Sequence, residues 1–485
     1  MTPNRRSLTY SVALFFLLSV PLVQAEKVTL ETSNWGLEGG KACVSCHEKS
    51  SAGLTMQWQN SAHAKNKVNC LDCHQAKKEE EDAIEHEGAI ISVIVSPKDC
   101  GRCHGKEFEQ QQGSKHSQAM SSITARMPHL AKQMGDNSTL LLSCAKCHGS
   151  KVEVNGDGTI NPLTWPNNGI GRINPDGSLG SCSACHGRHQ FSKQQARQPE
   201  ACTHCHHGTD SPDKDIYANS KHGMMYQGFK SKMNLDSDNW VAGQDYYAAP
   251  TCVTCHMGAA GKIKSSHDVG MRDSWNLNRP ISKKQSLVIL DNGNKIEVAD
   301  DEAPSRRGES IELADGTTAK VKAIASSKRR RQVMSNVCQE CHSKMFAKSH
   351  FNNMDAQIEL YNDKYGLPAQ QIMAQLYEDK LLTPMPFDET IEVTFWELWH
   401  NEGTRFRHAA AMGDKSAAWW EGIFSLGTNF YGKFLPQLKQ LAGKEKAEQL
   451  ITEHVKENDN HLWFNNLNKE SKLLGVEKGN DEYDF

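Results

Sequence analysis

Beyond its first 25 positions the sequence has no apolar run long enough to cross a bilayer, and only 38% of its 485 residues are apolar. A membrane-spanning helix needs about 20 consecutive apolar residues, so a polytopic membrane protein is excluded. Positive charge is not in excess, because 55 Lys and Arg residues stand against 58 Asp and Glu residues. Nucleic-acid binding is therefore not expected. Cysteine is also scarce, with 16 residues, too few for a small disulfide scaffold.

The first 25 residues have the pattern of an export signal. Two arginines at positions 5–6 precede an apolar stretch at 8–23, and Ala25 ends a small-residue cleavage site. Cleavage there leaves a mature chain that starts at Glu26 and lies in the periplasm, across the inner membrane. An uncleaved membrane anchor is the alternative interpretation.

Every cysteine belongs to one of eight C-x-x-C-H motifs, numbered one to eight in chain order. They are Cys43, Cys46 and His47; Cys70, Cys73 and His74; Cys100, Cys103 and His104; Cys144, Cys147 and His148; Cys182, Cys185 and His186; Cys202, Cys205 and His206; Cys252, Cys255 and His256; Cys338, Cys341 and His342. This motif is the attachment signature of c-type haem, in which two thiols bind the vinyl groups and the histidine binds iron. Disulfides do not require the histidine, and zinc sites favour paired cysteines without it. The sequence predicts eight covalently attached haems.

The predicted fold is a mainly α-helical multihaem cytochrome c. The porphyrins supply much of the apolar interior, which explains the low content of apolar side chains. Such a chain wraps its cofactors with short helices and loops. We expect an octahaem domain over residues 26–353 and a C-terminal helical domain over residues 354–485.

A closed electron-transfer haem needs a second axial ligand, usually histidine. Seven histidines outside the motifs are candidates, several of them in a small-polar context such as S-K-H: His63, His116, His129, His189, His222, His267 and His350. Seven candidates for eight haems suit one open iron, which could bind and transform a substrate. Eight closed irons would make an electron conduit. The remaining histidines, His86, His204, His207, His400, His408, His454 and His461, are more typical of surface or packed positions.

Between the last two motifs the sequence changes character. Two stretches rich in strand-forming residues surround the turn signals Asn292-Gly293 and Asp315-Gly316. They predict a small β insertion at about residues 281–333. The basic run Lys328–Arg331 is interpreted as a solvated face, with a docking patch for an acidic redox partner as the alternative.

Residues 150–180 are rich in Gly, Asn, Pro and Asp and predict an ordered loop. Asp157 and Asp176 could bind calcium there, although plain turn chemistry is favoured. From residue 354 the pattern is helical, with Phe395, Trp399 and Phe406 on one face of the predicted helix and a charged helix at about 443–472. The tail is expected to cap the haem core or to mediate subunit contact.

The eight motifs and the tail resemble the octahaem hydroxylamine oxidoreductase family over about residues 40–440. The stretches that carry the resemblance are GRINPDGSLGSCSACHGRHQFSKQQARQPEACTHCHHG, IYANSKHG, FWELWHNEGTRFRHAAAM and AAWWEGIFSLGTNFYGKFLPQL. The resemblance implies a homotrimer with seven bis-histidine haems and one five-coordinate catalytic haem. It also implies a redox partner, such as a c-type or quinol-linked cytochrome, and small nitrogen compounds as substrates.

Two departures from the family concern the direction of the reaction. Oxidising members carry a tyrosine, bound covalently to the catalytic haem of a neighbouring subunit, before their paired tryptophans; the matching position here is about Ala417. Members without this crosslink resemble reductases. The family also often has Asp-His after its sixth motif, whereas here Ser211 follows Asp210. Proton supply is then expected from Asp210 with His207 or His222.

The resemblance favours the fourth motif as the catalytic haem, with the fifth as second choice. Arg126 is a candidate for binding an anionic substrate, as an arginine does in related nitrite reductases. The predicted activity is reduction of nitrite or hydroxylamine to ammonium. Hydroxylamine oxidation is the first alternative, and a non-catalytic electron conduit, or reduction of another small oxyanion, is the second.

Overall fold

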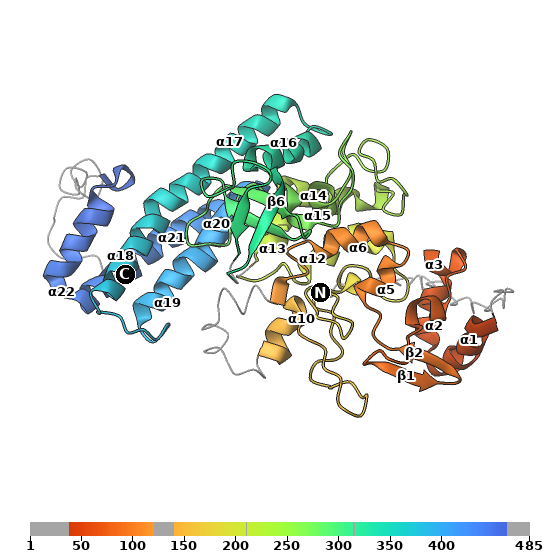
Figure 1. Ribbon diagram of the computed structural model, residues 1–485. Coiled ribbons are helices and arrows are strands. Elements are labelled where there is room, and N and C mark those ends of the chain that lie inside the picture. The colour runs from red at the N-terminus through yellow and green to blue at the C-terminus, as the bar shows by residue number, and fades with distance from the viewer. Residues whose placement is uncertain (1–37, 121–139, 210, 314–315, 463–485) are drawn as a thin grey trace, which may run out of the picture.

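The structure, a computed structural model, describes residues 38–120, 140–209, 211–313 and 316–462. In Figure 1 the N-terminal helices (red and orange) lie at one end of the molecule and the C-terminal helices (blue) at the other, with strand β6 near the middle. Across the described ranges, no helix has both the length and the apolar character that crossing a bilayer requires.

The haem motifs lie on or beside short helical turns. A helix brings residues i, i+3 and i+4 to one face, so two cysteines and the histidine after them project to the same side. The helices that hold or adjoin the motifs are α1 (Glu38–Ser50), α4 (Cys70–His74), α5 (Pro97–Gly101), η1 (Leu140–Cys144), α10 (Ala145–His148), η2 (Cys182–Ala184), α12 (Glu200–Thr203), α15 (Cys252–His256) and α16 (Ser327–Cys338).

Side-chain caps fix where several of these turns begin. Before motif two, Asn69 Oδ1 accepts from Leu71 N at 2.8 Å, while Asp72 Oδ2 accepts from Asn69 N at 2.7 Å. This reciprocal capping box satisfies amides that a helix start leaves unpaired. The helices between the motifs are also short: α2 (Ala52–Gln59), α3 (Ala62–Lys65), α6 (Gly105–Gln112), α11 (Lys193–Arg197), α13 (Asp213–Asn219), α14 (Lys221–Phe229), η3 (Lys230–Lys232) and η4 (Val269–Arg272).

The predicted β insertion is present as a four-stranded antiparallel sheet. Strands β3 (Gln285–Leu290), β4 (Lys295–Ala299), β5 (Ser310–Glu312) and β6 (Thr318–Ala325) lie in the order β4-β3-β6-β5. The turn expected at Asn292-Gly293 joins β3 to β4, with Gly293 at φ +88°. Asp315 lies outside the described residues.

A second, smaller sheet was not predicted. Strands β1 (Ala83–His86) and β2 (Ala89–Ser92) form a hairpin between motifs two and three. Its two turn residues, Glu87 and Gly88, both have positive φ, 48° and 79°. That backbone pattern matches the right-handed twist of hairpin strands.

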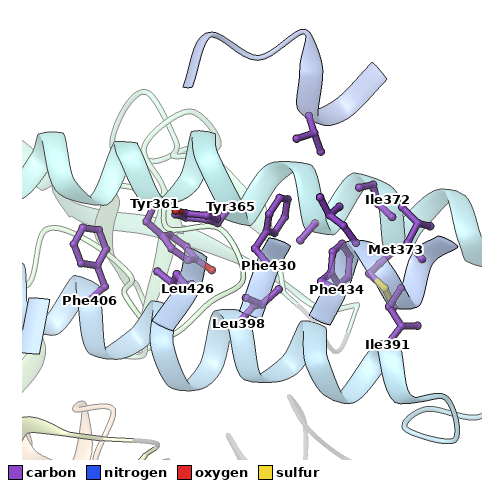
Figure 2. Packing of buried hydrophobic residues seen from close by; sticks show 14 of the residues in the cluster. Tyr361, Tyr365, Ile372, Met373, Ile391, Leu398, Phe406, Leu426, Phe430 and Phe434 are labelled. Carbon is purple, nitrogen blue, oxygen red and sulfur yellow. The ribbon is translucent and has the colours of Figure 1, made fainter. Parts of the chain in front are cut away.

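The C-terminal part is a helical bundle around the largest apolar cluster of the described residues. Figure 2 shows Phe430 and Phe434 between the long helix carrying Tyr361 and Tyr365 and the helix carrying Leu398. Phe406 is buried in this cluster, as the sequence pattern predicts. Its helices are α17 (Lys344–Tyr361), η5 (Asn362–Gly366), α18 (Leu367–Glu378), α19 (Thr390–Trp396), η6 (Glu397–Glu402), α20 (Gly403–Met412), η7 (Ala417–Phe424), α21 (Ser425–Asn429), η8 (Phe430–Phe434), α22 (Leu435–Ile451), η9 (Thr452–Lys456) and η10 (Asp459–His461).

Of two further sequence interpretations, the structure confirms one and corrects the other. Residues 150–180 form turns and isolated bridges, as predicted for an ordered loop. The basic run 328–331 is not a uniformly solvated face, because Arg330 is buried and binds the carbonyls of Met271, Gln285 and Gly270. Burying a guanidinium is possible where carbonyls satisfy its donors.

Candidate functional site

Five of the eight motif histidines face a second histidine ring at nearly the same separation. The centroid distances are 6.3 Å for His47–His86, 6.1 Å for His63–His104, 6.3 Å for His74–His189, 6.0 Å for His116–His206 and 6.0 Å for His222–His342. Two imidazoles that bind one iron from opposite sides have centroids about 6.2 Å apart, because each nitrogen lies about 2.0 Å from the metal and about 1.1 Å from its ring centre. The pairs therefore fit bis-histidine haems at motifs one, two, three, six and eight.

Four of these partners, His63, His116, His189 and His222, are among the histidines that the sequence marks as distal ligands. The fifth, His86, faces His47 at the same separation, although the sequence pattern placed it among the surface or packed histidines. His86 lacks the small-polar context of His63, His116 and His222, and it lies beside motif one because it ends strand β1, at the hairpin turn.

The other candidates are placed less directly. His267 lies near the ring of His186 in motif five: burial lowers the pKa of His186 to about 4, and His267 adds to that shift. His350 lies near His222 and His342, and its Nε2 donates to Ala411 O at 3.1 Å. His129 and Arg126 lie outside the described residues.

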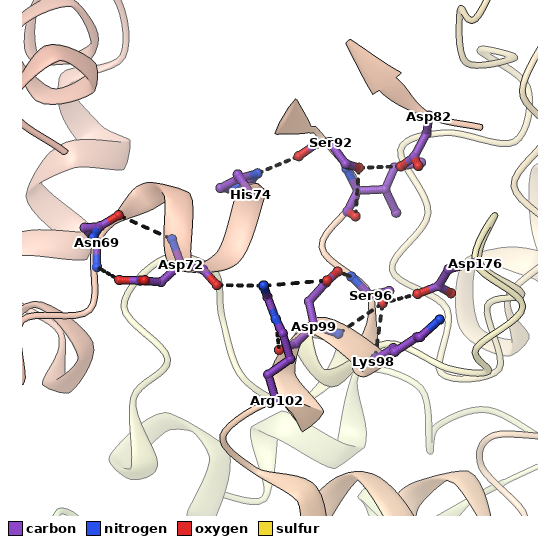
Figure 3. A network of polar contacts seen from close by, with 11 residues as sticks. Asn69, Asp72, His74, Asp82, Ser92, Ser96, Lys98, Asp99, Arg102 and Asp176 are labelled. Carbon is purple, nitrogen blue, oxygen red and sulfur yellow. Dashed lines mark hydrogen bonds and ion pairs between the residues drawn. The ribbon is translucent and has the colours of Figure 1, made fainter. Parts of the chain in front are cut away.

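Two motif histidines, His74 and His206, turn Nδ1 toward an acceptor, which leaves their Nε2 to face the iron position. His74 Nδ1 lies 2.8 Å from Ser92 O, in the polar network of Figure 3. His206 Nδ1 lies 3.0 Å from Asp213 Oδ2, and His256 Nδ1 lies 3.6 Å from Asp273 Oδ1.

Figure 3 also shows how motifs two and three are locked together. Arg102, inside motif three, donates to Asp72 O of motif two at 2.6 Å. Ser96 caps the turn before motif three and donates to Asp176 Oδ2 at 2.6 Å. Because Asp176 and Asp157 both accept from neighbouring hydroxyl and amide groups, their contacts are those of turns; calcium binding stays a prediction.

The cysteine sulfurs give the order of the motifs in space. Contacts between cysteine side chains join motif one to two, three to five and six to seven: Cys43–Cys70, Cys100–Cys182 and Cys202–Cys252. Cysteines of different motifs that lie close enough to interact connect two to three, five to six and seven to eight: Cys73–Cys100, Cys185–Cys205 and Cys255–Cys338. The motifs thus form a line in the order one, two, three, five, six, seven, eight.

Motif four joins this line from the side, at motif six. Cys147 and Cys205 are hydrogen-bonded, and burial together with Cys147 raises the pKa of Cys205 to about 12. His116, which faces His206 of motif six, is also close enough to His148 of motif four and His256 of motif seven for both to lower its pKa. Motif six is therefore the junction at which motifs four, five and seven meet.

The loop of residues 150–180 packs directly onto motif four. Ile170 N donates to Cys147 O at 2.9 Å, and Gly171 N donates to His148 O at 3.1 Å. The approach requires glycine: a Cβ on Gly149, which has φ +86°, would lie 2.3 Å from Arg172 N. The backbone that follows the candidate catalytic motif is held by this loop.

The structure describes two of the three predicted proton-handling residues. Asp210 lies outside the described residues, His207 is exposed, and His222 faces His342 of motif eight. Sequence reasoning missed Asp213 and His408, whose contact at 2.8 Å links motif six to helix α20. No local pattern marks this pair, because its members are far apart in the chain.

Two known families match parts of the chain. Residues 176–289 and 315–387 match the family described as seven times multi-haem cytochrome CxxCH. Residues 99–187 match the family described as cytochrome c554 and c-prime. Together these matches indicate covalently bound c-type haems.

A curated relative and two solved structures extend the comparison. A probable nitrite reductase-hydroxylamine oxidoreductase fusion protein of Kuenenia stuttgartiensis is 28% identical over 375 residues, which are 71% of this chain but only 38% of that protein. A hypothetical multiheme protein has a TM-score of 0.71 at 24% identity and covers 84% of this chain and 96% of its own. A Kuenenia stuttgartiensis reducing HAO-like protein complex has a TM-score of 0.56 at 20% identity, with 85% and 88% covered.

At these identities the two solved structures show a shared fold, and the fusion protein shows homology over part of its length. Neither transfers an activity by itself. Together with the motifs and the facing imidazoles, these matches show a multihaem cytochrome c fold and homology to part of a probable nitrite reductase-hydroxylamine oxidoreductase fusion protein.

Proposed function

We propose that the protein is a periplasmic oxidoreductase that reduces nitrite, hydroxylamine or both to ammonium at motif four. The observation that carries this proposal is the position of motif four beside the junction at motif six. A catalytic haem must receive electrons quickly but need not pass them on, so a side position suits it. The remaining motifs form a line that can collect and deliver charge.

Cys144, Cys147 and His148 would hold a haem at motif four, and that haem would supply an open iron position and electrons for a small nitrogen ligand. Reduction of nitrite to ammonium consumes six electrons and eight protons and releases two waters. Hydroxylamine requires two electrons and releases one water. Storage on neighbouring haems suits such multi-electron steps.

The chain's own residues would supply positioning and protons. Asp210, four residues after His206 ends motif six, is proposed as the proton donor, with His207 as an exposed relay to solvent. Arg126 is proposed to hold an anionic substrate. His222 suits a ligand role, because its ring faces His342.

The reductive direction is supported by the residues before the paired tryptophans. Positions 413–418 contain no tyrosine, so the haem crosslink of oxidising relatives has no counterpart in the sequence. Trp419, Trp420 and Phe424 of helix η7 are each more than half exposed. We propose that this aromatic surface lies in a homotrimer interface, and that a c-type or quinol-linked cytochrome supplies electrons.

The test uses the purified haem-loaded chain. We expect a reduced dye to be consumed when nitrite or hydroxylamine is added, with ammonium as product, and Arg126→Gln to raise KM for nitrite. Hydroxylamine-dependent reduction of an oxidised acceptor, without dye oxidation, would instead identify a dehydrogenase. No turnover in either direction, with no exogenous ligand able to coordinate iron, would identify a conduit.

A further inference from the structure

Asp213 forms a bridge between a haem ligand and the C-terminal bundle. Its Oδ2 lies 3.0 Å from His206 Nδ1 at motif six, and its Oδ1 lies 2.8 Å from His408 Nδ1 on helix α20. The other ring nitrogen of His408, Nε2, lies 2.9 Å from Asn278 Oδ1, within hydrogen-bond distance. Both carboxylate oxygens are thus occupied by imidazoles from different parts of the chain.

The carboxylate is held in its charged form. The side chain of Asp213 is only about a quarter exposed, 24%. A carboxyl group that lies between two imidazoles able to donate to it is favoured in its charged form. A negative charge therefore sits behind the axial imidazole of motif six.

The other motif histidines described above have weaker partners on Nδ1. His74 contacts a neutral carbonyl, Ser92 O, and the contact of His256 with Asp273 is longer, 3.6 Å. A carboxylate on Nδ1 increases the basicity of an axial imidazole, strengthens its donation to iron and favours the ferric state. The closely held carboxylate lies at the junction where motifs four, five and seven meet.

We propose that Asp213, oriented by His408, is a positioning residue that lowers the reduction potential of the haem at motif six. Helix α20 thereby influences the haem at motif six through the hydrogen bond between His408 and Asp213. A low potential at the junction favours delivery of electrons to its neighbours over their accumulation there. This inference rests on haem attachment and not on which nitrogen compound is the substrate.

The decisive variant is Asp213→Asn in the haem-loaded full chain, because it keeps the shape and removes the charge. We expect one component, about one eighth of the haem absorbance change if eight haems are present, to titrate at a higher potential in optical spectroelectrochemistry. The low-spin ferric EPR signals should change for one haem only. Asp215→Asn, an exposed aspartate on the same helix, is the matched control and should leave the titration unchanged.

Two further variants keep the test decisive if Asp213→Asn fails to retain its haems. Asp213→Glu restores the charge and is expected to keep the low potential. His408→Gln frees one carboxylate oxygen without touching His206, and is expected to shift the same component by less than Asp213→Asn. Titration curves that superimpose on the wild type for His408→Gln and for any haem-loaded Asp213→Asn, or an equal shift with Asp215→Asn, would overturn the proposal. These measurements need no substrate, so a failed activity assay leaves the outcome readable.

Discussion

At the scale of single residues, the facing imidazoles are the most informative feature of this chain. Each pair brings together two histidines whose proximity cannot be predicted from the sequence alone. His74 and His189, for example, are 115 positions apart and their rings lie 6.3 Å from each other. Iron ligation converts such a pair into a covalently anchored crosslink between segments. Loss of one ring should therefore change both the haem's spin state and the local fold.

His86 provides the sharpest test at this scale. His86→Ala removes the ring that faces His47, so we expect the haem at motif one to lose its sixth ligand and become high-spin or to bind added imidazole. EPR and optical spectra of the ferric protein measure this change. Glu85→Ala, at an exposed neighbour on the same strand, is expected to keep the wild-type spectrum. An unaltered spectrum in His86→Ala would show that His86 does not bind the haem iron at motif one.

A second residue-scale prediction concerns pH. Burial raises the pKa of the Glu402 carboxyl, whose Oε1 accepts from Asn429. The folded state then binds the proton more tightly than the unfolded state, so this group's contribution is complete below its unfolded pKa of about 4.3 and is lost as pH rises through the folded pKa.

We accordingly expect the Tm of Glu402→Gln, relative to wild type, to increase as pH rises through that window. Thermal unfolding followed by circular dichroism across the acidic range measures the difference. Glu453→Gln alters an exposed glutamate of η9 and serves as the control. A difference between Glu402→Gln and wild type that does not vary with pH would contradict the linkage.

Some of the important residues could be predicted from the sequence, and others could not. The eight C-x-x-C-H motifs are visible in the sequence, because two thiols and a histidine on one helical turn are a local pattern. His86, Asp213 and His408 carry no such local signature, since each acquires its role from a partner in another element. Their roles depend on tertiary contacts, which residue spacing does not encode.

At the scale of elements, the β insertion forms ion pairs with the segments that carry two candidate distal ligands. Lys295 of β4 binds Asp268, next to His267, at 2.6 Å. Glu297 of the same strand binds Lys115, next to His116, and also the buried Arg330. The insertion was predicted from its strand residues and turn signals, but its contact with the ligand segments was not predictable from either.

Glu297→Gln should weaken the attachment of the β insertion to the segment that carries His116. The change leaves the positive charges of Lys115 and Arg330 without their shared carboxylate, and we expect a loss of about 3 kcal/mol or more in stability, typical of breaking a buried ion pair. The EPR signal of the haem bound by His116 should broaden. Denaturant unfolding and EPR measure the two effects. Glu312→Gln, exposed on strand β5, is the control, and equal stability of the two variants would exclude this attachment.

The loop over motif four gives another element-scale prediction. Gly149→Ala adds a methyl group that would lie 2.3 Å from Arg172 N, at a φ of +86°. Gly177→Ala, at φ +77° with open space around it, carries similar backbone strain without the clash.

Strain alone should cost about 1 kcal/mol. We expect Gly149→Ala to cost more than Gly177→Ala and also to disturb the haem spectrum of motif four. Unfolding midpoints and the high-spin EPR signal distinguish the two variants. Similar spectra and similar stabilities would mean that the loop does not hold the motif.

For the whole molecule, the fold class followed from the sequence but the path of the haem line did not. Motifs three and five are neighbours through Cys100 and Cys182, although motif four lies between them in the chain. The loop of residues 150–180, which joins motif four to motif five, folds back onto motif four, so motif five can lie beside motif three. Chain order therefore predicts a linear series of haems, whereas the structure has a junction.

That junction leads to a prediction for electron delivery. Replacing both cysteines of motif six, Cys202 and Cys205, by alanine removes the haem where motifs four, five and seven meet. Replacing Cys338 and Cys341 removes motif eight, at the end of the line, and is the matched control. We expect the motif-six variant to lose most nitrite- and hydroxylamine-dependent oxidation of a reduced protein donor, while the motif-eight variant retains more of it. Haem content by pyridine haemochrome verifies that each variant lacks one haem only, and equal activity in the two variants would mean that electrons reach motif four without passing motif six.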